Sequence, residues 1–272
     1  MKRADLHMHT TYSDGSYTLN EVVGFAKEKG LNYISITDHD TLVGSLKAYK
    51  ELNGTDLKII IGLELSSDNN GESIHVLGYF KNDTNLKGLD SYLEEQRKLR
   101  RVRANKIKEA LYKYFNIDLD MSFIEKLYSV TRGSIANEII KQGYPYTKEE
   151  IFAKMIGEGC PAYYPSTKLN TIDAVKLIHE YGGLAVLAHP CLIKHNDVSE
   201  LLSYGFDGIE AIYPKNKEND EERFRKLAKK YNIFVTAGSD FHSFNDEKHG
   251  NIGDVSLTNM DLEIFLNKLE VK

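Results

Sequence analysis

The sequence contains no tryptophan, only two cysteines and no long apolar run. Cys160 and Cys191 lie far apart and in no paired spacing, so we expect reduced thiols and no disulfide framework. No stretch approaches the roughly 20 apolar residues that a membrane span requires, and the first residues, MKRADLHMHT, lack the apolar core of a signal peptide. These absences predict a cytoplasmic protein that has no membrane partner.

Neither positive nor negative charge is in large excess. The chain has 35 Lys and Arg against 40 Asp and Glu, which gives a formal net charge of -5. This balance provides no overall attraction to nucleic acid or acidic lipid, so an anionic substrate must be captured locally. The 272 residues suffice for one large domain or two small ones, and nothing in the sequence indicates an obligate protein partner.

Short apolar, β-branched runs alternate with amphipathic helical patterns, which is typical of a βα-repeat protein of the α/β class. We predict seven strands, at residues 4–7, 33–37, 58–65, 73–79, 184–188, 207–212 and 233–238. Two intervening helices have clear boundaries. One should begin after the cap Thr18 and end at Gly30, and the other should begin after Asn170 and end at Gly182.

The third and fourth predicted strands are separated only by residues 66–72, SSDNNGE. This segment is too short for a crossover helix and is rich in turn-forming residues. We therefore expect these two strands to form an antiparallel hairpin around a loop at 66–72.

Ionisable residues gather where the predicted strands end. Most follow the carboxyl ends of strands, and His75 begins the antiparallel fourth strand, which starts at the same rim. The complete set is His7, His9, Asp14, His39, Glu64, His75, His189, Asp240 and His242. A lone histidine at a strand end is usually structural, but burying so many ionisable groups together is costly without cations. Mixed imidazole and carboxylate ligands favour zinc, manganese or iron over calcium, and nine ligands predict two or three divalent ions.

The same residues lie in segments that resemble a known family. ADLHMHTTYSDGS, ITDHD, GLELS, IHVLGYF, GGLAVLAHP and GSDFH resemble, in order, the motifs of the polymerase and histidinol phosphatase (PHP) family, in its branch of small stand-alone phosphoesterases. The resemblance implies a distorted seven-stranded (β/α) barrel with a metal cluster at its carboxyl face. It also implies three ligand groups: His7, His9, Glu64 and Asp240; the bridging Glu64 with His75 and His189; and Asp14, His39 and His242.

This resemblance implies a metal-dependent phosphoesterase that uses a metal-bridged hydroxide. The expected substrate is a phosphomonoester, such as a nucleotide or nucleoside 3′,5′-bisphosphate, or the 5′ end of short RNA. His39, His189 or Asp240 could move a proton, and the sequence does not choose among them. Histidinol phosphate is the alternative substrate. A non-catalytic, metal-stabilised binding module is an alternative of another class, although the degraded modules of polymerases lack several ligands and none is missing here.

Residues 85–168 interrupt the barrel, which comprises 1–84 and 169–272, with helical patterns that we interpret as an inserted helical lid subdomain. Arg132 resembles the phosphate-contacting arginine of a family motif GRPH, although this sequence reads TRGS. Tyr163, in CPAYYP, similarly resembles a family segment KPAYV. We therefore expect Arg132 and Tyr163 to bind substrate, whereas the basic run RKLRRVRANKIK is interpreted as a solvated helix face.

Other polar residues near the predicted rim have weaker signals. Asp38 and Asp40 flank a predicted ligand and Glu210 ends the sixth strand, so each could orient a ligand, with a capping or turn role as the alternative. His249 lies in a rim loop and has no spacing partner. His179 lies on a predicted helix and is expected to be structural.

Overall fold

The computed structural model of the chain describes residues 2–82, 84–126, 130–244 and 246–270. Contacts divide the chain into two compact units. The sheet unit comprises Met1–Asp90 and Leu169–Lys272, and the insert unit comprises Ser91–Lys168. No helix in the described residues is long and apolar enough to cross a membrane.

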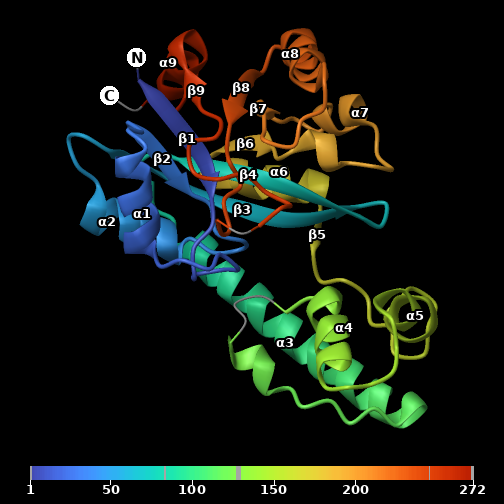
Figure 1. The fold of residues 1–272 in the computed structure, drawn as a ribbon. Coiled ribbons are helices and arrows are strands. Elements are labelled where there is room, and N and C mark those ends of the chain that lie inside the picture. Colours follow the sequence, from blue (N-terminus) through green and yellow to red (C-terminus); the bar gives the residue numbers. More distant parts are fainter. Residues whose placement is uncertain (1, 83, 127–129, 245, 271–272) are drawn as a thin grey trace. The chain divides into compact units, whose positions relative to one another are not determined.

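The described part of the sheet unit is built on one sheet of nine strands, in the order β8-β7-β6-β4-β3-β2-β1-β9, with β5 paired to β3 (Figure 1). The strands are β1 (Arg3–Met8), β2 (Tyr33–Ile36), β3 (Lys58–Asn69), β4 (Glu72–Phe80), β5 (Leu169–Asn170), β6 (Leu184–Leu187), β7 (Gly208–Ile212), β8 (Phe234–Ala237) and β9 (Leu257–Thr258). The seven predicted strands are all present. The prediction missed β5 and β9, because two-residue strands are too short to show periodicity.

The sheet curves until β1 meets the segment that follows β8. Met8 forms a parallel bridge with Phe241, just after β8, and the backbone N–H of His9 donates to the carbonyl of Phe241 at 2.9 Å. The backbone N–H of Asp240 donates to the carbonyl of His7 at 2.8 Å. The unit is therefore a mixed α/β fold around a nearly closed barrel-shaped sheet.

Strands β3 and β4 form the antiparallel hairpin that the sequence predicted. The expected loop at 66–72 is wrong, because both strands continue until only Asn70 and Gly71 separate them. These two residues have φ of 52° and 83°, as a tight two-residue hairpin turn requires. In this ladder His75 on β4 pairs with Ser66, two residues beyond Glu64 on β3.

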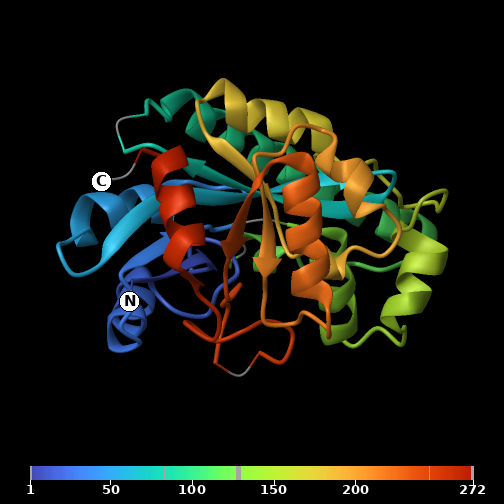
Figure 2. The same ribbon diagram turned by 90° about the horizontal axis from the view of Figure 1, so that it is seen from above.

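Helices lie around the outside of the curved sheet (Figure 2). They are α1 (Leu19–Glu28), α2 (Val43–Leu52), α6 (Thr171–Glu180), the short 3₁₀ turn η3 (Pro190–Leu192), α7 (Val198–Leu202), α8 (Asp220–Tyr231) and α9 (Asn259–Lys268). The predicted caps are confirmed, since Thr18 and Asn170 each accept a hydrogen bond from a backbone N–H of the first helical turn. Gly30 and Gly182 follow the helix ends with φ of 67° and 68°, the left-handed conformation typical of that position.

The insert unit is helical and has a hydrophobic core of its own. Helix α3 (Lys87–Phe115) enters it from the sheet unit, and η1 (Ser122–Lys126), α4 (Arg132–Lys141), α5 (Lys148–Ile151) and the π-helical turn η2 (Phe152–Ile156) complete it. Ile107 and Leu111 of α3 are buried in one cluster with Ile135, Ile139 and Ile156. The helical character agrees with the sequence pattern, whereas the action of this unit as a lid stays a prediction.

Candidate metal centre

The centre forms where the strands of the sheet unit end in sharp turns. Asp40, His189 and Asp240 follow β2, β6 and β8 with φ of 53°, 27° and 54°. A left-handed backbone costs a residue with a side chain on the order of 1–3 kcal/mol, and such strain persists mainly at functional sites. Gly238 lies beside these turns, and a Cβ at that position would overlap the Cβ of His7. The local backbone is thus fitted to bring side chains together at this rim.

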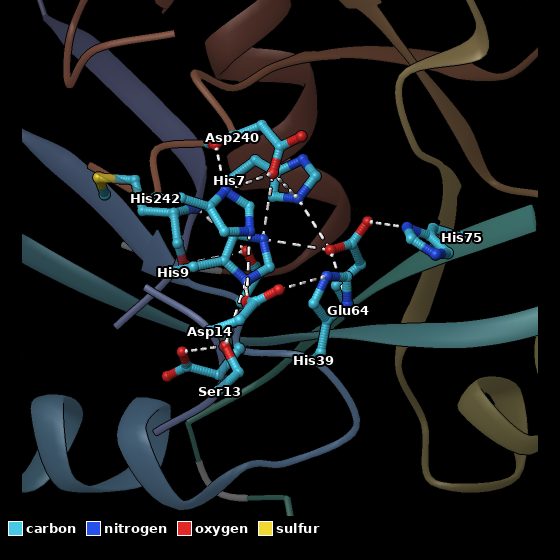
Figure 3. Close-up of polar contacts among 12 residues, drawn as sticks. His7, His9, Ser13, Asp14, His39, Glu64, His75, Asp240 and His242 are labelled. Carbon is cyan, nitrogen blue, oxygen red and sulfur yellow. Dashed lines mark hydrogen bonds and ion pairs between the residues drawn. The ribbon is translucent and has the colours of Figure 1, made fainter. Parts of the chain in front are cut away.

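Glu64 lies among five imidazoles, and Figure 3 labels four of them, those of His7, His9, His39 and His75. Its Oε1 is 2.8 Å from His75 Nδ1 and 3.0 Å from His189 Nε2. Its Oε2 faces three further nitrogens, which are His39 Nδ1 at 3.1 Å, His9 Nε2 at 3.2 Å and His7 Nε2 at 3.3 Å. One buried carboxylate therefore contacts imidazoles from β1 and the residue after it, from β4 and from the loops after β2 and β6.

Two further carboxylates extend this cluster. Asp240 Oδ1 lies 3.2 Å from His9 Nε2 and 3.3 Å from His7 Nε2. Asp14 Oδ1 lies 3.2 Å from His242 Nε2, and its other oxygen lies 3.7 Å from His39 Nε2. The structure thus brings all nine residues of the predicted ligand set into one contiguous cluster.

The donor atoms of the cluster fit divalent cations. Several of its buried polar atoms have no hydrogen-bond partner, and these are His7 Nε2, His9 Nε2, His39 Nδ1, Glu64 Oε2, His189 Nδ1 and Asp240 Oδ1. A buried polar atom without a partner costs about 1–3 kcal/mol. So many unpartnered atoms are therefore unfavourable unless another species, such as a metal ion, binds to them. One ligand atom each from His7, His9, Glu64 and Asp240 lies within 4.8 Å of the others, as a shared ion requires.

The charges of the cluster shift the pKa values of its members in opposite directions. Burial raises the pKa of Glu64, but the surrounding imidazoles more than offset this and hold it well below its usual range. Burial lowers the pKa of His7, but Asp240 and two glutamates reverse the effect and hold it well above its ordinary value. For His39, burial prevails and lowers the pKa to about 4. Glu64 is thus ionised, whereas protons and metal ions compete for the nitrogens of His7.

Glu210 and Tyr213 hold three members of the cluster in place. Glu210 is fully buried; its Oε1 lies 3.0 Å from His7 Nδ1, and its Oε2 accepts the backbone N–H of His189 at 2.8 Å. Tyr213 donates its hydroxyl to Asp240 Oδ2 at 2.9 Å. An orienting role for Glu210 was one of two readings of the sequence, and its contacts agree with it. Tyr213 was missed, because a tyrosine just after a strand gives no sequence signal.

Asp38 and Asp40 brace the backbone around the cluster. Asp38 Oδ1 accepts the backbone N–H of Thr10 at 2.7 Å and the hydroxyl of Ser13 at 2.8 Å, which fixes the loop after β1. Asp40 Oδ1 accepts the backbone N–H of Ser66 at 2.8 Å, on the strand that carries the central glutamate. Both aspartates thus position the chain segments that present cluster residues.

Two other histidines have different surroundings. His249 lies beside the cluster, with its ring centre 4.1 Å from that of His242 and its Nδ1 2.6 Å from Asp246 Oδ2. The rim position predicted for His249 agrees with this contact, whereas its pairing with Asp246 was not predicted. His179 Nε2 instead lies 2.7 Å from Asp207 Oδ2, a pairing consistent with the structural role predicted for it.

The two predicted substrate-binding residues lie in the insert unit and contact each other. The guanidinium carbon of Arg132 is 5.3 Å from the ring centre of Tyr163, a cation–π arrangement. Its Nη1 donates to the carbonyl of Ile156 at 3.4 Å. The insert unit therefore holds this arginine in a defined position within its own structure.

Comparisons with known proteins agree with this architecture. The PHP domain family model matches residues 5–238. The chain is 30% identical over 249 residues to the 5′-3′ exoribonuclease Rnm of Escherichia coli K12, covering 88% of this chain and 84% of that protein. It is 26% identical over 253 residues to the 3′,5′-nucleoside bisphosphate phosphatase of Chromobacterium violaceum, covering 89% and 88%. A solved structure from Bifidobacterium adolescentis, described as a metal-dependent phosphoesterase, has the same fold, with a TM-score of 0.71, 24% identity and coverage of 97% and 96%.

The contacts of Glu210 generate a prediction about metal binding. Glu210→Gln keeps the size of the side chain, but an amide group cannot accept hydrogen bonds from both His7 and the His189 backbone. We expect metal affinity to fall about 10–100-fold, as for other residues that orient metal ligands. Competition with a chromogenic chelator would measure it. Glu218→Gln, an exposed glutamate in the loop after the same strand, is the matched control. Equal affinity in Glu210→Gln and the unmutated protein would contradict the orienting role.

Proposed function

Because the chain belongs to the PHP domain family, we propose that it is a metal-dependent phosphoesterase that hydrolyses phosphomonoesters of nucleotides, nucleoside 3′,5′-bisphosphates or the 5′ end of short RNA. The membership confirms the family resemblance, and the relatives that are phosphatases or exoribonucleases support the class of reaction. The observation that carries the proposal is the cluster around Glu64, where carboxylates and imidazoles converge and their buried atoms lack partners. Such a donor set suits manganese, iron or zinc.

The distances support three ligand groups, two of which share Glu64. The first is His7, His9, Glu64 and Asp240, the second is Glu64 with His75 and His189, and the third is Asp14, His39 and His242. Glu64 belongs to two groups, because its Oε1 and Oε2 face different sets of imidazoles. We assign Glu64 as the bridging ligand and expect two or three divalent ions.

Bound divalent ions would neutralise the phosphoryl oxygens and lower the pKa of a water. The protein must also move a proton, and the three candidates differ in solvent access. The side chain of His39 is 19% exposed and that of His189 is 12% exposed, whereas that of Asp240 is 5% exposed and already accepts the hydroxyl of Tyr213. A group that passes a proton to a leaving oxygen must reach the substrate, so this comparison argues against Asp240.

The choice of substrate rests on the relatives and on the insert unit. Two relatives are an exoribonuclease and a nucleoside bisphosphate phosphatase, and they point to ribonucleotide chains and nucleoside bisphosphates. Both are phosphate esters of nucleosides, and we extend this class to the present chain. Arg132, stacked on Tyr163, suits a phosphate group because a guanidinium can donate two parallel hydrogen bonds. We further propose that the insert unit acts as a lid that restricts which substrates enter.

Glu64→Gln tests the bridging assignment. The change keeps the size of the side chain and removes the negative charge that two ions would share, so turnover should fall by several orders of magnitude while the fold persists. Turnover, metal content and the circular dichroism spectrum would be measured together. His179→Ala, a histidine outside the cluster, should leave turnover unchanged. A Glu64→Gln protein that retains its metal and near-normal turnover would show that Glu64 is not the bridge.

A substrate panel tests the proposed specificity. It comprises a nucleoside 3′,5′-bisphosphate, a nucleoside 5′-monophosphate, histidinol phosphate, linear 5′-phosphorylated RNA and circular RNA of the same sequence. We expect hydrolysis of the nucleoside phosphates or of linear RNA, and none of the circle, because a lid admits a terminal phosphate but obstructs a continuous strand. Efficient cutting of the circular RNA would refute the proposal that the enzyme acts only at a terminal phosphate. Preference for histidinol phosphate would favour the alternative substrate.

A further inference from the structure

Arg103 is a second arginine of the insert unit, and one of its guanidinium nitrogens has no hydrogen-bond acceptor. It lies on α3, in the basic run that the sequence suggested is a solvated helix face, but its side chain is half-buried. Its Nε donates to the backbone carbonyl of Tyr164 at 3.0 Å, while its Nη2 is buried and has no hydrogen-bond partner. A buried guanidinium N–H without an acceptor is unfavourable, so an anion or another acceptor that binds at this position would be stabilised.

Arg103 and Arg132 are held by the same stretch of chain. The carbonyl of Tyr164 accepts from Arg103, and the carbonyl of Ile156 accepts from Arg132, whose guanidinium also stacks on Tyr163. The backbone N–H of Ala162 donates to the carbonyl of Met155 at 2.9 Å, which closes this segment on itself. Both guanidinium groups are therefore positioned by backbone contacts within the insert unit.

Among the described residues, no carboxylate neutralises the two positive charges. Within the part of the chain that the structure describes, neither Arg103 nor Arg132 forms an ion pair with a carboxylate. Burial, and then the positive charge of Arg132, lower the pKa of Arg103. The protein thus keeps two cationic groups near each other at a cost that an anionic ligand would offset.

We propose that Arg103 and Arg132 bind one phosphate group of the substrate together, with Arg103 donating through its unpartnered Nη2. This inference rests on the proposed function for the identity of the ligand as a phosphate ester. Two guanidinium groups carry two positive charges and match the dianion of a terminal phosphate better than the single charge of an internal phosphodiester. The pair therefore selects substrates that carry a terminal phosphate.

Phosphate binding to the full-length protein tests the pair directly. Inorganic phosphate is titrated calorimetrically into chelator-treated protein, so that the metal cluster does not contribute. Arg103→Lys and Arg132→Lys keep the charge but lose the planar guanidinium, so each should weaken binding by about tenfold or more. The double variant should bind phosphate more weakly than either single variant. Its total loss of affinity should nevertheless be smaller than the product of the two single losses, because both arginines act on one ion. Arg101→Lys, an exposed arginine on the same helix, is the matched control and should bind as the unmutated protein does.

Kinetics of the metal-loaded enzyme give a second readout. With a nucleoside 5′-monophosphate, Arg103→Lys should raise KM while kcat and metal content change little, since it acts on binding and not on the cluster. Unchanged phosphate binding and unchanged KM in Arg103→Lys would overturn the inference, as would the absence of saturable phosphate binding in the unmutated protein. If phosphate binds as expected but no phosphomonoester is hydrolysed, the proposed function fails and the arginine pair stands.

Discussion

The concentration of negative charge and imidazoles around one buried carboxylate is the constraint on which the rest of the site depends. Glu64 is fully buried, and five imidazole nitrogens lie within 3.3 Å of its oxygens. Such a group is stable only if its charges are balanced, and the orphaned donor atoms show that the protein alone does not satisfy them. Divalent cations would supply the missing partners, which is why we interpret the cluster as a metal centre.

The surrounding structure holds this centre open to ions by fixing its ligands in advance. Glu210 fixes His7 and the backbone of His189, while Tyr213 fixes one oxygen of Asp240 and leaves the other toward the cluster. Left-handed turns after three strands add local strain that this hydrogen bonding must offset. Pre-organisation of this kind reduces the entropy lost when ions bind, since the side chains are already confined.

Much of the centre could be predicted because its residues are attached to regular elements. Strand ends of a βα-repeat sheet converge on one rim, so locating the strands was enough to bring distant residues such as His7, Glu64 and Asp240 together. The hairpin needed more than periodicity, because the Asn70-Gly71 turn extends both strands beyond the apolar pattern. His249 and Tyr213 lie in loops, where no period indicates which way a side chain points, so His249 was placed only at the rim and Tyr213 was missed.

Arg103 illustrates a different limit of sequence reasoning. A basic run on a helix is usually solvated, and nothing in the order of residues indicates that one member has a buried, unpartnered nitrogen. That property arises from the packing of α3 against a segment about 60 residues later, in which Tyr164 supplies the carbonyl partner. Features that depend on such long-range packing appear only in the folded chain.

Metal content per chain tests the central claim most directly. The purified protein, stripped of metal and reconstituted in turn with manganese, iron and zinc, would be subjected to elemental analysis after removal of unbound ions. The cluster around Glu64 predicts two or three ions per chain with at least one of these metals, because nine converging ligands exceed one coordination sphere. One ion or none with every metal would contradict this account.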